Sequence, residues 1–101
     1  MITEIVELRV KPGGVEKFAA AVDSSNPLFA HSPGFIDLEL HQSIEEVFSI
    51  ILLIKWDSVA HHMEMFRKSS EYVLWRAAIG EFFLRADRHR KMIELKRSTL
   101  P

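Results

Sequence analysis

Apolar residues alternate with polar residues in several short stretches of the chain, a pattern typical of half-buried β-strands. In the first of them, Glu4 shares one side of the predicted strand with Val6, Leu8 and Val10. The same reasoning predicts four strands, over residues 2–10, 35–42, 47–56 and 88–96.

Between these predicted strands, apolar residues recur at the spacing of an α-helix. An apolar stripe from Val15 to Val22 predicts an amphipathic helix after the first strand. A second helix is expected after the third strand, where Asp57 or Ser58 can serve as its N-cap. After a short interruption, a further helical stretch is predicted over residues 71–84.

The resulting order, β-α-β-β-α-α-β, is that of a ferredoxin-like α+β fold, in which helices pack on one face of an antiparallel four-stranded sheet. A chain of 101 residues is long enough for one hydrophobic core, so we expect a single domain over residues 1–101.

The third predicted strand is apolar on both sides. If one side packs against the helices, then Val47, Ile51 and Leu53 point to the other side. At ~25 cal/mol per Å² of apolar area, leaving that face in water would cost several kcal/mol. We therefore expect a homodimer in which the two sheets face each other.

Composition and charge narrow the class of partner. Apolar residues make up 48% of the chain and charged residues 27%, which are globular proportions. The net charge of −1 offers no electrostatic attraction for nucleic acid or an anionic membrane. The longest apolar run, residues 50–54, is far shorter than the ~20 residues that span a bilayer. We expect a cytoplasmic protein that binds neither nucleic acid nor membrane.

Three short motifs follow one another along the chain: Val10-Lys11-Pro12-Gly13, Ser32-Pro33-Gly34-Phe35 and Trp56-Asp57-Ser58. Over nearly the whole chain, their arrangement resembles the antibiotic biosynthesis monooxygenase (ABM) domain family. The resemblance implies a dimeric α/β barrel. The family includes cofactor-free monooxygenases that oxidise anthrones to quinones, quinol oxygenases, haem-degrading enzymes and proteins that handle small signalling molecules.

The resemblance also bears on individual positions. In the haem-degrading branch, a haem-contacting tryptophan and a haem-ligating histidine stand where this chain has Met65 and Trp75, so haem degradation is not implied. The anthrone-oxidising branch has a strand-ending tryptophan, which Trp56 matches. That branch has asparagine where Leu52 stands and tyrosine where His62 stands.

His62 is the leading candidate for a catalytic base. It lies on the apolar face of its predicted helix, beside Phe66, and a partly buried imidazole can accept a proton near neutral pH. Trp56 could donate its indole N–H to a substrate oxygen. Both residues also have a structural interpretation: His62 as a core histidine bonded to a backbone carbonyl, and Trp56 as a residue that closes the end of the core.

Apolar and aromatic residues in the second half of the chain could wall a pocket for a flat substrate, although the same spacing is typical of core residues. The candidates are Leu52, Met65, Phe66, Tyr72, Trp75 and Ile79. No metal site is expected, because the chain has no cysteine and its five histidines lack the spacing of a ligand motif. No cofactor is expected.

The leading hypothesis is a cofactor-independent monooxygenase that acts on a small aromatic or polyketide-type substrate, in the class that converts anthrones or quinols to quinones. Two alternatives stay open. One is a non-catalytic dimeric barrel that binds a small ligand. The other is an isomerase or cyclase, since a non-oxidative reaction could begin with the same proton abstraction.

Overall fold

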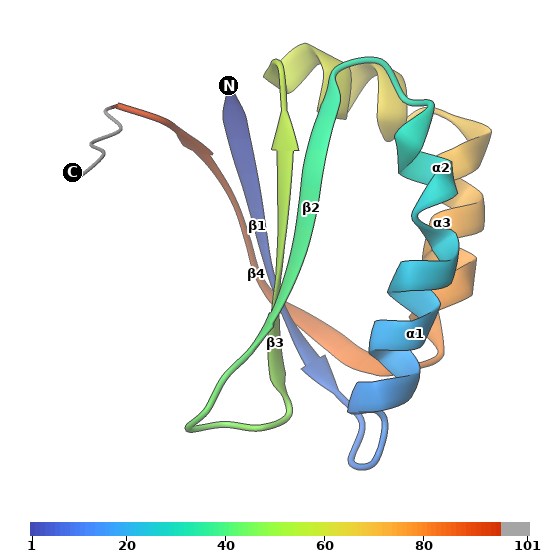
Figure 1. Ribbon diagram of the computed structural model, residues 1–101, viewed down its shortest axis with the longest axis vertical. Helices are drawn as coiled ribbons and strands as arrows, with labels where there is room; N and C mark the ends of the chain where they lie inside the picture. Colours follow the sequence, from blue (N-terminus) through green and yellow to red (C-terminus); the bar gives the residue numbers. More distant parts are fainter. Residues whose placement is uncertain (96–101) are drawn as a thin grey trace, which may run out of the picture.

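The computed structural model describes residues 1–95, apart from the side chains of residues 62–64. Its elements, in chain order, are β1 (Ile2–Val10), α1 (Val15–Ser25), α2 (Pro27–Ala30), β2 (Phe35–Gln42), β3 (Ser49–Trp56), the π-helical segment η1 (His61–Phe66), α3 (Ser70–Gly80) and β4 (Phe83–Ile93). Figure 1 shows the strands as one layer and the α-helices as a second layer on one face of the sheet. The predicted ferredoxin-like α+β fold is confirmed.

The sheet is antiparallel, with the strand order β2-β3-β1-β4. Residues that pair across neighbouring strands lie on the same face of a sheet. Leu52 of β3 and His89 of β4 both pair with Val6, so all three face the helices. The core lies between the two layers, and its buried residues include Leu8, Phe18, Ile50, Ile54 and Ile79.

The last part of the chain corrects the sequence prediction. α3 ends at Gly80, whereas the helix was predicted to continue to residue 84. β4 begins at Phe83, five residues before the predicted start, and pairs there with the end of β1. The aromatic residues after Gly80 continue the helical spacing, but they also favour a strand, and β1 offers them a backbone partner. β4 ends at Ile93, so the predicted continuation through residues 94 and 95 is wrong, and residue 96 lies outside the described residues.

β3 is also shorter than predicted. It begins at Ser49, so Val47 and Phe48 lie in the preceding loop, where they are 49% and 37% exposed. Val47 therefore does not contribute to the uncovered sheet face. Ile51 and Leu53 do lie on that face, because they alternate with the buried inward residues of the strand.

The helix predicted after β3 is wound as a π-helix over most of its length. Ser58 caps it, since its hydroxyl accepts a hydrogen bond from the backbone N–H of His61 at 3.2 Å. Phe66 at the end of η1 is buried, whereas Val59, before η1, is 43% exposed. π-helical turns are rare and occur often at functional sites.

The Pro33-Gly34 turn packs against the start of η1. Gly34 has a φ of +79°, and a Cβ atom at this position would overlap the imidazole of His61. Its carbonyl accepts the backbone N–H of Asp57 at 2.8 Å. Only glycine satisfies both the backbone angle and this close approach, so Gly34 fixes the beginning of β2 beside the end of β3.

Phe29, on the short helix α2, is the centre of a cluster of aromatic rings. Its side chain is fully buried. Its ring stacks on Phe66 with the centroids 4.5 Å apart and meets Trp75 edge-on at 5.0 Å. The rings of Phe35 and Trp56 lie 5.4 and 6.1 Å away. The short segment between α1 and β2 thus contributes a central core residue.

Candidate functional site

The inward side of β1 carries one acidic residue, Glu4, in a series of apolar neighbours. Glu4 is 5% exposed. Its Oε1 accepts a hydrogen bond from the indole Nε1–H of Trp56 at 3.1 Å, and its Oε2 lies 2.6 Å from Nε2 of His89. A buried carboxylate is costly unless it is paired and hydrogen-bonded. These two contacts therefore hold the carboxylate in a fixed position.

His89 reaches this carboxylate from β4, one of the two edge strands of the sheet. It pairs with Val6, on the same face as Glu4, and the register between β1 and β4 shifts just beyond this point, after Glu7. The His89 side chain is 36% exposed, against 6% for the Glu4 side chain. The imidazole thus connects a buried carboxylate to the surface, and the Glu4–His89 pair can hold one proton between its two members.

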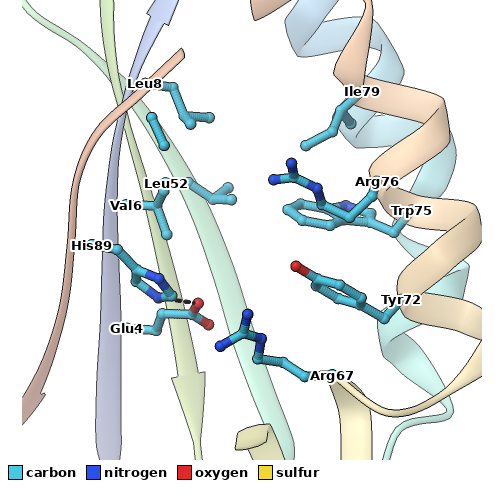
Figure 2. A pocket seen from close by; sticks show the side chains of 11 residues that line it. Glu4, Val6, Leu8, Leu52, Arg67, Tyr72, Trp75, Arg76, Ile79 and His89 are labelled. Atoms are coloured by element: carbon cyan, nitrogen blue, oxygen red, sulfur yellow. Dashed lines mark ion pairs between the residues drawn. The ribbon is translucent and has the colours of Figure 1, made fainter.

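α3 provides the opposite wall. Ser69 caps the helix by accepting the backbone N–H of Tyr72 at 3.2 Å. Tyr72, Trp75 and Ile79 follow at intervals of three and four residues, so they share the face that packs toward the sheet. In Figure 2 the Tyr72 hydroxyl points toward Glu4 and His89 across the space between the layers.

A cavity of about 240 Å³ separates the two walls. Its apolar lining includes Val6 and Leu52 from the sheet and Trp75 and Ile79 from α3. Its polar lining converges from both sides, because the Glu4–His89 pair faces Tyr72 and two arginines. A cavity with apolar walls and a few converging polar groups is the usual form of a small-molecule site.

The two arginines, Arg67 and Arg76, enter from the helix side. Figure 2 shows both guanidinium groups extending toward the sheet. The guanidinium carbon of Arg67 lies 5.8 Å from the centroid of the Tyr72 ring, and that of Arg76 lies 5.5 Å from the centroid of Phe83. Both are cation–π distances, so aromatic rings support the two cations at the cavity edge.

This arrangement suits a reaction that begins with loss of a proton. The Glu4–His89 pair can take a proton from a bound carbon acid or phenol. The arginines and the Tyr72 hydroxyl can stabilise the negative charge that then develops on the substrate oxygen. The apolar walls can hold a flat ring between the sheet and Trp75.

The sequence-predicted pocket residues fall into two groups. Leu52, Tyr72, Trp75 and Ile79 line the cavity. Phe66 lies behind it, in the aromatic cluster, with its ring centroid 5.5 Å from that of Tyr72. Met65 is 45% exposed and is not among the lining residues. The pocket was thus predicted to extend farther along η1 than the cavity does.

The structure describes the side chain of only one of the two predicted catalytic residues, Trp56 and His62. Trp56 is fully buried and donates its indole N–H to Glu4, so its contact with a substrate would be indirect. The side chain of His62 lies outside the described residues, and its role stays a prediction.

Four polar residues of the cavity were not predicted from the sequence: Glu4, Arg67, Arg76 and His89. The sequence could have indicated Glu4, because a carboxylate among the inward-facing apolar residues of a half-buried strand is unusual. The sequence could not have indicated His89, because the face of the sheet on which it lies depends on the register of β4 against β1. Both arginines lie in stretches whose charge is equally consistent with a solvated helix surface.

Neither a metal cluster nor a membrane span occurs in the described residues. No three histidine, cysteine, aspartate or glutamate side chains among them lie together in a way that could hold a metal ion. In the same part of the chain, no helix has both the length and the apolar character needed to cross a membrane. The cytoplasmic location stays a prediction.

Comparisons with known proteins agree with this architecture. The uncharacterized protein YczJ of Bacillus subtilis (strain 168) is 32% identical over 83 residues, which are 82% of this chain and 87% of YczJ. A crystal structure of a proposed antibiotic biosynthesis monooxygenase from Bordetella bronchiseptica has 33% identity and a TM-score of 0.89, and the match covers 94% of this chain and 97% of that one.

A more distant structure has the same fold. SnoaB, a cofactor-independent oxygenase from Streptomyces nogalater, matches 99% of this chain and 96% of its own, with 18% identity and a TM-score of 0.76. The family model for antibiotic biosynthesis monooxygenase matches residues 1–78, which include all of β1 to η1 and most of α3. From this match and the two relatives above 30% identity, we conclude that the chain belongs to the antibiotic biosynthesis monooxygenase family.

Proposed function

We propose that this protein is a cofactor-independent monooxygenase that oxidises a small aromatic carbon acid or quinol to a quinone. The observation that carries the proposal is the pair formed by the buried Glu4 and the partly exposed His89 at the wall of a largely apolar cavity. Acid–base chemistry and an apolar ring site are the two requirements for this reaction, and here they meet in one place. Membership of the family and the fold shared with SnoaB support it.

In the proposed reaction, the Glu4–His89 pair first removes a proton from the ring carbon of the substrate. The resulting carbanion, with its charge spread onto an oxygen near Tyr72, transfers an electron to dioxygen. The substrate radical and superoxide then combine into a peroxide, which takes a proton back and eliminates water. A CH₂ group and O₂ thereby become C=O and H₂O, so the electrons come from the substrate alone. A quinol reacts in the same way through its keto tautomer, which has a ring CH₂ group, and the product is then a hydroxyquinone.

The size of the cavity restricts the substrate. An engineered cavity of about 150 Å³ is large enough for benzene, and the cavity here measures about 240 Å³. Ligand sites for larger molecules usually have about 300–1,000 Å³. A substrate with one or two rings fits this space better than the larger polyketides considered from the sequence.

Oxygen uptake by the metal-depleted protein tests this function. The panel contains one- and two-ring hydroquinones and, as a three-ring comparison, anthrone. We expect uptake that depends on the protein, with one atom of ¹⁸O₂ in the product. A product of unchanged mass would indicate an isomerase or cyclase. Binding without any product would indicate the ligand-binding barrel.

We also propose that two copies pair through the uncovered sheet face. Ile5, Ile51 and Leu53 form an apolar strip along its middle strands. On this face β2 carries Asp37 and Glu39, whereas β4 carries basic residues, Arg88 and Arg90. A two-fold axis parallel to the strands would place the acidic β2 of one copy over the basic β4 of the other.

Replacing Leu53 by Glu is expected to abolish this pairing. The new carboxylate would lie in the apolar strip, directly across from Glu39 of β2. Light scattering after size exclusion should give twice 11.7 kDa for the unmodified chain and 11.7 kDa for Leu53→Glu. Lys17→Glu, on the exposed side of α1, is the control and should keep the dimer mass. A monomeric unmodified chain at micromolar concentration would contradict the proposal.

A further inference from the structure

The polar side of the cavity has more positive than negative charge. Its one acidic lining residue, Glu4, is already bonded to Trp56 and His89. Arg67 and Arg76 enter the same cavity from the opposite wall. Charges in a partly enclosed site act strongly on a bound molecule, because water screens them less. The cavity therefore favours a ligand that carries a negative charge of its own.

Arg76 is the better placed of the two cations. Within the part of the chain that the structure describes, no carboxylate lies within 4.0 Å of its guanidinium nitrogens. Its contact is with the ring of Phe83. A guanidinium supported by a ring face keeps its in-plane N–H donors for other groups, and these donors match a carboxylate in a bidentate way.

Trp75 adds a second, independent observation. Trp75 lines the cavity and is 6% exposed. Its Nε1 atom is buried and has no hydrogen-bond partner among the described residues. Buried polar atoms nearly always have a partner, and a donor-only indole N–H needs an acceptor oxygen. A ligand oxygen beside α3 would supply that acceptor.

From these observations we infer that the cavity selects aromatic carboxylic acids of one or two rings, whose carboxylate is bound by Arg76 and the Trp75 indole N–H. The ring then lies against the apolar sheet wall, with its other edge toward the Glu4–His89 pair. This inference rests on the proposed function only in that both use the same cavity. It concerns binding and requires no turnover.

Isothermal titration of the protein compares two probes with the same naphthalene ring, 2-naphthoate and 2-naphthol. We expect 2-naphthoate to bind at least tenfold more tightly. In Arg76→Gln, 2-naphthoate should lose about 10- to 100-fold in affinity, the range for a hydrogen bond to a charged group. The affinity for 2-naphthol should change by less than about twofold, because Gln keeps most of the packing of the side chain.

Two further variants complete the test. Trp75→Phe keeps an aromatic ring but has no N–H, and it should weaken 2-naphthoate more than 2-naphthol. Arg85→Gln removes an exposed arginine whose partner is Asp87 and which does not line the cavity, so it should change neither affinity. Equal affinities for the two probes, equal losses of both in Arg76→Gln, or no binding of either probe would overturn the inference. Oxygen uptake is measured separately, so failure of the monooxygenase proposal would be recognised independently.

Discussion

Replacing His89 by Gln is expected to lower the rate of oxygen uptake about 10²- to 10⁴-fold, the usual contribution of a positioned acid–base group. The carboxamide of Gln can still donate a hydrogen bond to Glu4, so the buried carboxylate keeps a partner. It cannot take up a proton at neutral pH, and the proposed first step therefore fails. The measurement is the initial rate with the best substrate of the quinol panel, at saturating concentration.

Three companion variants test whether the base is the Glu4–His89 pair or His62. Glu4→Gln should cause a loss of similar size, because the two residues act as one pair and their effects are not additive. His62→Gln tests the base predicted from the sequence. His31→Gln, in the exposed turn after α2, is the matched control and should keep the full rate. Full activity in His89→Gln, or loss only in His62→Gln, would contradict the assignment of His89.

The largest expected effect on stability is that of Phe29→Ala, which should lower the free energy of unfolding by about 3–5 kcal/mol. The Phe29 side chain is fully buried, and four aromatic rings surround it. Its removal would leave a cavity between two rigid layers that cannot easily close. The loss is large compared with a total stability of about 5–15 kcal/mol for a typical domain.

Urea denaturation at one fixed protein concentration measures this loss. Phe48→Ala is the matched control, since it deletes the same side chain from a loop position that is 37% exposed. It should cost less than about 1 kcal/mol. Phe29→Leu should fall between the two. Equal midpoints for Phe29→Ala and Phe48→Ala would show that α2 does not hold the aromatic cluster together.

The fold could be predicted well where the local pattern and the tertiary contacts agree. The alternation in residues 2–10 and 35–42 predicted the bounds of β1 and β2, and Ser58, one of the two expected N-caps, caps the helix after β3. The prediction failed after Gly80, where the aromatic residues suit either a helix or a strand. There the choice is made by pairing with β1, which no local pattern contains.

The apolar and aromatic walls of the candidate site, including Leu52 of β3, were predicted from the sequence, whereas its charged residues were not. Tyr72, Trp75 and Ile79 lie on one continuous stripe, so periodicity alone places them together. The partnership of Glu4 and His89 depends on the register between the first and last strands, including a shift after Glu7. When that register is not known, Glu4 and His89 are two unrelated polar residues far apart in the sequence.

The position of β1 between β3 and β4 has a consequence for how the protein folds. β1 leaves the ribosome before both of the strands with which it pairs, and β4 is made after the other three strands of the sheet. Contacts between such distant segments slow folding, because a long loop must close before they can form. Until β4 emerges, the backbone edge of β1 that pairs with it stays open to the strands of other nascent chains.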